Sequence, residues 1–64
     1  MLTLLLDIPQ RKIYYIDQDA NPASFLIIDD KAGGILINSP VFSEALLSTI
    51  NKETNIDYIF YLLG

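Results

Sequence analysis

Short apolar runs alternate with polar, turn-forming segments along the first half of the chain. The runs are rich in β-branched and aromatic residues, which favours strands over helices. We predict four strands here, namely Leu2 to Leu6, Lys12 to Ile16, Ser24 to Ile28 and Ile35 to Ile37. The links between successive strands are short, so the strands are expected to pair antiparallel.

The apolar spacing changes to a helical period in the second half. Leu46, Leu47 and Ile50 fall on one face at that period, which predicts a helix from Val41 to Lys52. An aromatic and β-branched run from Tyr58 to Leu63 then predicts a final strand. A strand, a helix and a strand joined by short loops form a right-handed βαβ crossover.

Candidate capping residues flank the predicted helix. Pro40 suits a first helical turn, and either Ser39 or Ser43 can serve as the N-cap. Glu44 favours the positive end of the helix, and Asn55 is a plausible stop. Upstream, Gly33-Gly34 indicates a tight turn.

These elements predict an α/β fold, or α+β by a stricter count. The architecture is a small, mostly antiparallel sheet that leads into one βαβ unit, with the helix on one sheet face. The chain, 1–64, is expected to be a single small domain or a partial domain. Hydrophobic residues make up 52% of it, and neither cysteine nor histidine is present to staple the fold. We therefore expect the excess apolar surface to be buried against another copy, against a protein partner, or within a larger domain.

The net charge of the chain limits the kinds of partner that it is expected to bind. Four basic and eight acidic residues give a net charge of −4, which argues against nucleic acid and against anionic membrane surfaces. No apolar run approaches the roughly 20 residues that cross a bilayer. Met1 to Leu6 has no basic segment before it, so it does not resemble a secretion signal. A cytoplasmic protein is the default expectation.

One loop has part of a calcium-binding pattern. Asp17, Asp19 and Asn21 match the opening D-x-D-x-N of a calcium loop. However, Pro22 stands where that loop needs glycine, and Ile28 stands where it needs a bidentate glutamate. We therefore interpret the segment as a polar turn.

The remaining polar residues form no recognisable catalytic set. Asp29 and Asp30 are adjacent carboxylates expected in a turn, without the cleft that paired-acid catalysis needs. Gly33-Gly34 opens a strand rather than a helix, so it is not a phosphate-binding loop. The serines have no histidine to activate them. We predict no catalytic, cofactor-binding or metal-binding residue and no cofactor.

From Asn21 onward the chain resembles the opening part of the metallo-β-lactamase-fold hydrolases. That opening runs N-x-[FY]-L-I, a turn, G-G-x-L-I-D-[ST]-P/G, a helix, and I-D-x-I-[FL]-[LI]-T-H. The matching segments here are Asn21 with Ser24 to Ile27, Gly33 to Pro40, Phe42 to Lys52, and Ile56 to Phe60. The resemblance implies the N-terminal portion of an αββα metallo-hydrolase.

The chain departs from this family at the positions that carry chemistry. Asn38 replaces the family's aspartate, and Leu62-Leu63 replaces its Thr-His. The metal-binding H-x-H-x-D-H does not occur in these residues, so no family ligand can be assigned. The resemblance therefore implies a truncated, non-catalytic relative with a structural or interaction role. The alternative is a self-associating or partner-binding module without enzymatic ancestry; a carboxylate-based ion binder is a weaker third hypothesis. In both leading hypotheses we expect a homo-oligomer, most simply a symmetric dimer.

A metal analysis tests the non-catalytic prediction. Because the sequence lacks histidine and cysteine, the purified protein is expected to contain no stoichiometric zinc or iron and to show no metal-dependent hydrolase activity. Elemental analysis after exhaustive dialysis checks this. About one tightly held transition metal per chain would contradict it.

Overall fold

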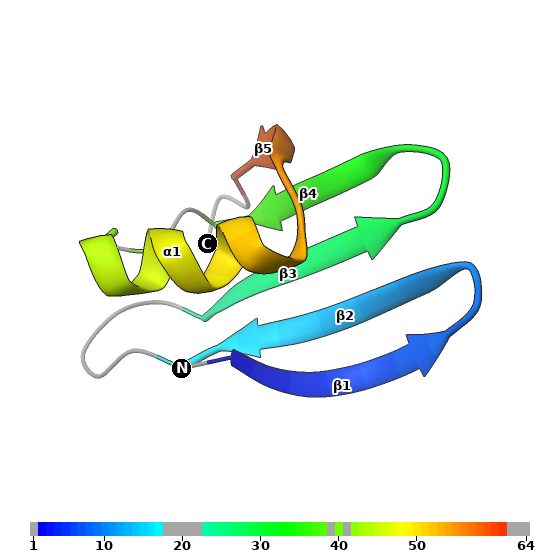
Figure 1. Cartoon of the computed structure of the whole chain (residues 1–64), viewed down its shortest axis with the longest axis horizontal. Helices are drawn as coiled ribbons and strands as arrows, with labels where there is room; N and C mark the ends of the chain where they lie inside the picture. Colours follow the sequence, from blue (N-terminus) through cyan, green and yellow to red (C-terminus); the bar gives the residue numbers. More distant parts are fainter. Residues whose placement is uncertain (1, 18–22, 39, 41, 62–64) are drawn as a thin grey trace.

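The apolar runs form a single sheet in the computed structural model, which describes residues 2–17, 23–38, 40 and 42–61. The described elements, in chain order, are β1 Leu2–Ile8, β2 Arg11–Ile16, β3 Ser24–Asp29, β4 Gly33–Ile37, α1 Glu44–Glu53 and β5 Ile56–Phe60. Neighbouring strands follow the chain order, β1-β2-β3-β4-β5 (Figure 1). Strands β1 to β4 pair antiparallel, and β5 pairs parallel to β4. The predicted fold class is confirmed, including the strand–helix–strand unit at its end.

The strands extend beyond their predicted bounds because their flanking polar residues join the ladders. Strand β1 continues to Ile8, which pairs with Arg11, the first residue of β2. Strand β3 ends at Asp29, which pairs with Gly33. The last strand is displaced toward the N-terminus: it runs from Ile56 to Phe60 instead of starting at Tyr58. The remainder of that prediction, Leu62 and Leu63, lies outside the described residues.

The helix begins later than predicted, at Glu44, because Ser43 caps it. Ser43 is extended, with φ −114° and ψ 165°, and its hydroxyl accepts a hydrogen bond from the Leu46 N–H at 3.1 Å. Phe42 therefore precedes the helix; Val41 and the other candidate cap, Ser39, lie outside the described residues. At the other end the Thr54 N–H donates to the Ile50 carbonyl at 3.0 Å, so Thr54, not Asn55, terminates the helix.

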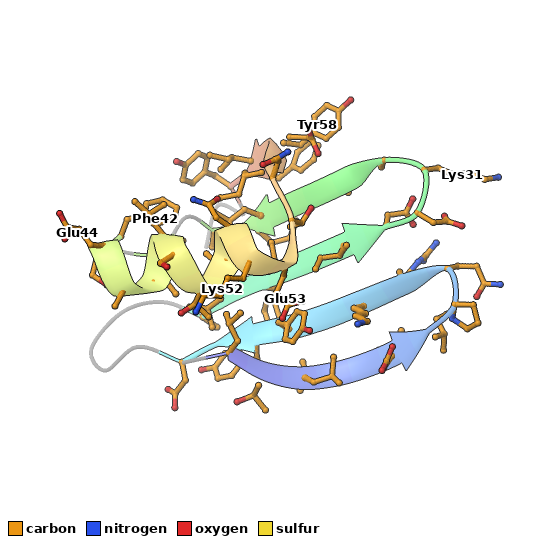
Figure 2. All side chains as sticks on the ribbon, viewed as in Figure 1. Lys31, Phe42, Glu44, Lys52, Glu53 and Tyr58 are labelled. Carbon is orange, nitrogen blue, oxygen red and sulfur yellow. The ribbon has the colours of Figure 1, made fainter. Side chains whose placement is uncertain are left out.

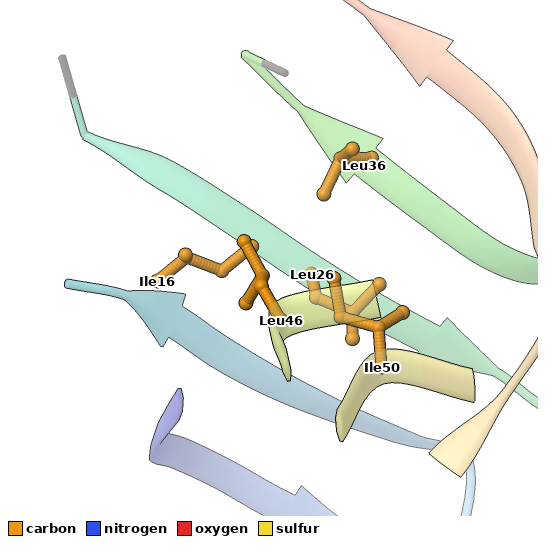
Figure 3. Close-up of a cluster of buried hydrophobic side chains, with 5 residues drawn as sticks. All are labelled: Ile16, Leu26, Leu36, Leu46 and Ile50. Carbon is orange, nitrogen blue, oxygen red and sulfur yellow. The ribbon is translucent and has the colours of Figure 1, made fainter. Parts of the chain in front are cut away.

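The core lies between α1 and one face of the sheet. It consists of Ile16, Leu26 and Leu36 from the three central strands and Leu46 and Ile50 from the helix (Figure 3). Leu47 was predicted to share the buried helix face, but its side chain is 38% exposed. It neighbours Leu46 in sequence and is therefore turned about 100° away around the helix. The helix covers one end of the sheet, and the two hairpin turns project beyond it (Figure 1).

The two glycines that open β4 serve different purposes. Gly33 has φ +87°, the left-handed conformation that the turn requires. Gly34 lies beneath the link from α1 to β5, and a Cβ there would overlap the Asn55 carbonyl oxygen. The predicted turn glycine is thus Gly33, whereas Gly34 provides the space in which the returning chain crosses the sheet.

Removing the helix cap tests this description of α1. Ser43→Ala is expected to lower the free energy of unfolding by about 1 kcal/mol, because the Leu46 N–H loses its acceptor. Ser48→Ala, on the exposed side of the same helix, is expected to have little effect. Urea denaturation followed by circular dichroism measures both, and equal losses for the two variants would contradict the cap assignment.

Candidate functional site

The acidic loop singled out in the sequence is described only in part. Asp17 follows β2 directly, whereas Asp19 and Asn21 lie outside the described residues. Over the described ranges, no group of three or more histidine, cysteine, aspartate or glutamate side chains is close enough to hold a metal ion. Ser43 caps α1, and Ser48 lies exposed on the same helix. Ser39 lies outside the described residues.

Asp29 is instead engaged within its own turn. Its Oδ2 accepts hydrogen bonds from the Lys31 N–H at 3.0 Å and the Ala32 N–H at 2.9 Å, and its Oδ1 lies 3.3 Å from Arg11 Nη2. The backbone hydrogen bonds from Ala32 and Lys31, followed by the charge of Arg11, lower the pKa of Asp29 below 3.8. Its carboxylate is therefore a turn-forming group. Asp30, which follows it in the turn, uses its own N–H to bond the Gln10 carbonyl at 3.0 Å and so ties the two hairpin turns together.

Asp57 has a structural role that the sequence pattern did not reveal. Its Oδ2 accepts a hydrogen bond from the Gly34 N–H at 2.9 Å, across the junction of β4 and β5. A Cβ on Gly33 would overlap the same carboxylate. The glycine pair thus holds the Asp57 carboxylate at the start of β5, although Asp57 itself is exposed. The corresponding sequence signal is a glycine pair followed at a distance by an aspartate near the beginning of the parallel strand.

A hollow of about 200 Å³ lies at the hairpin end of the sheet. Arg11 and Lys12 line it together with Asp30 and Glu53, so charges of both signs meet there. Figure 2 shows Glu53 at the end of α1 nearest to this region. The hollow is smaller than the roughly 300–1,000 Å³ of ligand pockets and is widely open. It is therefore not a strong small-molecule site.

The most extensive feature is the sheet surface opposite α1, which we call the open face. Because side chains alternate along a strand, the neighbours of the buried Leu26 and Leu36 point to this side. The register aligns them in two rows across the sheet: Tyr15, Phe25, Ile37 and Phe60 in one, and Leu6, Ile13, Ile27, Ile35 and Tyr58 in the other. On β1 the first row ends at Thr3, opposite Tyr15. All other members of the two rows are apolar or aromatic.

Charge on the open face is confined to a third row at its hairpin edge. There Arg11 and Asp29 occupy opposite positions on β2 and β3 and pair with each other at 3.3 Å. Aromatic rings meet within the first two rows: Tyr15 and Phe25 have centroids 5.6 Å apart, and Tyr58 and Phe60 have centroids 6.4 Å apart. At the margins of the open face, the side chains of Leu6, Tyr58 and Phe60 are 38%, 53% and 53% exposed. The first two rows thus carry no charge, in a protein whose net charge is −4.

Comparison with known proteins found no match among family models, curated proteins or solved structures. No helix in the described parts of the chain is long and apolar enough to cross a membrane.

The Asp29 turn makes stability depend on acid pH. The pKa of Asp29 is lowered in the folded protein, so the folded state favours the ionised carboxylate. The contribution of Asp29 to folding stability is therefore fully present above its pKa in the unfolded chain, near 3.8, and is lost as the pH falls through its lower pKa in the folded protein. Asp29→Asn removes the titrating group and is expected to flatten the loss of unfolding free energy below pH 4.

The control is Asp30→Asn, which leaves the contacts of the Asp29 side chain in place. It is expected to keep the wild-type decline in acid. Urea denaturation at several pH values between neutrality and 2.5 measures all three proteins. The same acid decline in Asp29→Asn as in the wild type would contradict the assignment.

Proposed function

We propose that this chain is a non-catalytic interaction module that associates with a second copy of itself through the open face. The observation that carries the proposal is the pair of apolar rows that cross the sheet on the side opposite α1. Large contiguous apolar surfaces on small proteins mark interaction sites. Fully burying one large apolar side chain contributes about 1.5–3 kcal/mol, so covering several stabilises an assembly substantially.

A second copy suits this surface on grounds of charge. Two chains of net charge −4 repel one another at long range, but the contact itself would bring no like charges together. Arg11 and Asp29, in the third row at the hairpin edge, already pair with each other, and the members of the two apolar rows are uncharged. The face therefore has no uncompensated charge with which to select an oppositely charged partner.

The size of the face is also adequate for self-association. Five strands spaced about 4.8 Å apart, each rising about 3.3 Å per residue, project an area of roughly 450 Å². Two such faces bury about 900 Å² by this projection, which is close to the roughly 1,000 Å² at which a biological interface is expected. Sheets that pack face to face in this manner form sandwiches about 10 Å apart.

Ancestry in the metallo-β-lactamase fold is part of the proposal. It is supported by the order of elements, in which antiparallel strands precede a β4–α1–β5 unit with parallel outer strands. In this account the chain keeps the opening of that fold and uses its sheet for association instead of catalysis. The alternative is a self-associating module of independent origin, which uses the same open face.

A charge placed at the centre of the open face tests the proposal. Ile27→Lys sits between Ile13 and Ile35, where a lysine stem can reach solvent from an isolated protomer but not from within a packed interface. The variant is expected to stay folded and to halve the mass of the assembly measured by light scattering. Ile27→Val is the matched control and should keep the wild-type mass. Retention of that mass by Ile27→Lys would refute the proposal.

A further inference from the structure

The two edges of the sheet differ in how well they are protected from pairing. Strand β1 has a bulge at Leu5, where the register shifts between Leu4 and Leu6, and it also carries Asp7. Bulges and edge charges are the devices by which natural sheets prevent edge-to-edge association. Strand β5 has its register shift and its charge only near its start, at Asp57. Its last residues, Tyr58 to Phe60, are uncharged and in regular register with β4.

The hydrogen-bond pattern shows which backbone groups of β5 face outward. The Phe60 carbonyl accepts from the Asn38 N–H at 2.8 Å, so the peptide groups of Phe60 point toward β4. Backbone groups alternate in direction along a strand. The N–H and carbonyl of Ile59 therefore point away from the sheet, along its free edge.

The side chains of this segment are also incompletely covered. Tyr58, Ile59, Phe60 and Tyr61 are 53%, 46%, 53% and 67% exposed. The one charge on the strand, Asp57, is held by the Gly34 N–H at 2.9 Å within the protomer. A second β5 laid antiparallel alongside would thus meet apolar side chains and the outward N–H and carbonyl of Ile59. In a pairing centred on Ile59, each Asp57 lies opposite Tyr61 of the other copy, so the two carboxylates do not face each other.

We infer that β5 pairs antiparallel with β5 of a second copy, using the outward N–H and carbonyl of Ile59. This inference rests on the proposed function, because it adds a second contact to the same self-association. The twofold axis that relates two antiparallel edge strands is perpendicular to the sheet, so both helices lie on one side and both open faces on the other. The edge contact therefore doubles the open face, and packing two doubled faces together produces a tetramer.

Proline at position 59 tests the edge contact selectively. Ile59→Pro removes only an N–H that faces away from β4, and proline is tolerated at such edge positions. The variant is expected to retain the wild-type circular dichroism spectrum while its assembly mass falls twofold, from four to two times 7.2 kDa. Ile59→Ala shortens the side chain but keeps the N–H, and it should keep the wild-type mass.

Combining the two interface variants separates failure of this inference from failure of the proposed function. Ile27→Lys and Ile59→Pro should each form dimers, and the double variant should be a monomer. If Ile59→Pro keeps the wild-type mass, the edge contact is wrong and the open-face proposal stands. If Ile27→Lys keeps it, the open-face proposal is wrong. A wild-type monomer at micromolar concentration overturns both.

Amide hydrogen exchange provides a second readout in case Ile59→Pro does not fold. In the wild-type assembly the Ile59 N–H is expected to be protected, and dilution to the monomer should restore rapid exchange. The Phe60 N–H, which faces β4, should stay protected in both states. Rapid exchange at Ile59 in the concentrated wild-type protein would overturn the edge contact.

Discussion

A single short helix against a five-stranded sheet is the constraint on which the described structure depends. A sheet needs both of its faces covered unless one of them is polar. In the described part of the chain, α1 covers one face and produces a core whose buried members are Ile16, Leu26, Leu36, Leu46 and Ile50. That is a small core for an isolated domain of this length. The open face, by contrast, is as apolar as the covered one.

The junction of β4 and β5 shows how the covered side is assembled. Gly34 leaves room for the chain to return across the sheet at Asn55, and its N–H binds the Asp57 carboxylate as β5 begins. The Asn38 N–H then bonds to Phe60 and closes the parallel ladder at its other end. Asn38 has φ +58°, a left-handed conformation that asparagine adopts more readily than most residues. These local contacts position β5 at the free edge of the sheet.

Most of the fold was predictable because the apolar residues recur at the periods of strands and of a helix. The four antiparallel strands, the helix and the parallel last strand were all anticipated. Ser43, one of the two predicted caps, is the N-cap. The errors arose where a single hydrogen bond decides a boundary: the helix begins at Glu44 rather than Val41, and Thr54 rather than Asn55 ends it. Leu47 was misplaced because three leucine and isoleucine residues at helical spacing do not reveal how wide the buried stripe is.

The candidate surfaces were predictable only in part. Apolar residues at consecutive positions in β2 and β3 indicate two apolar faces, so excess surface could be expected from the sequence. The pairing of Arg11 with Asp29, which neutralises the open face, depends on the register between strands, and register is not evident in either segment alone. The unprotected edge at Ile59 likewise depends on which way the peptide groups of Phe60 turn.

The central claim is that association stabilises the folded protomer, because the covered side alone gives a small core. Thermal unfolding as a function of protein concentration tests this most directly. When association adds to the stability of the folded protomer, mass action raises the melting temperature with concentration. We expect the melting temperature to rise by several degrees between 1 and 100 μM chain. A cooperative transition at the same temperature across that range would contradict the account.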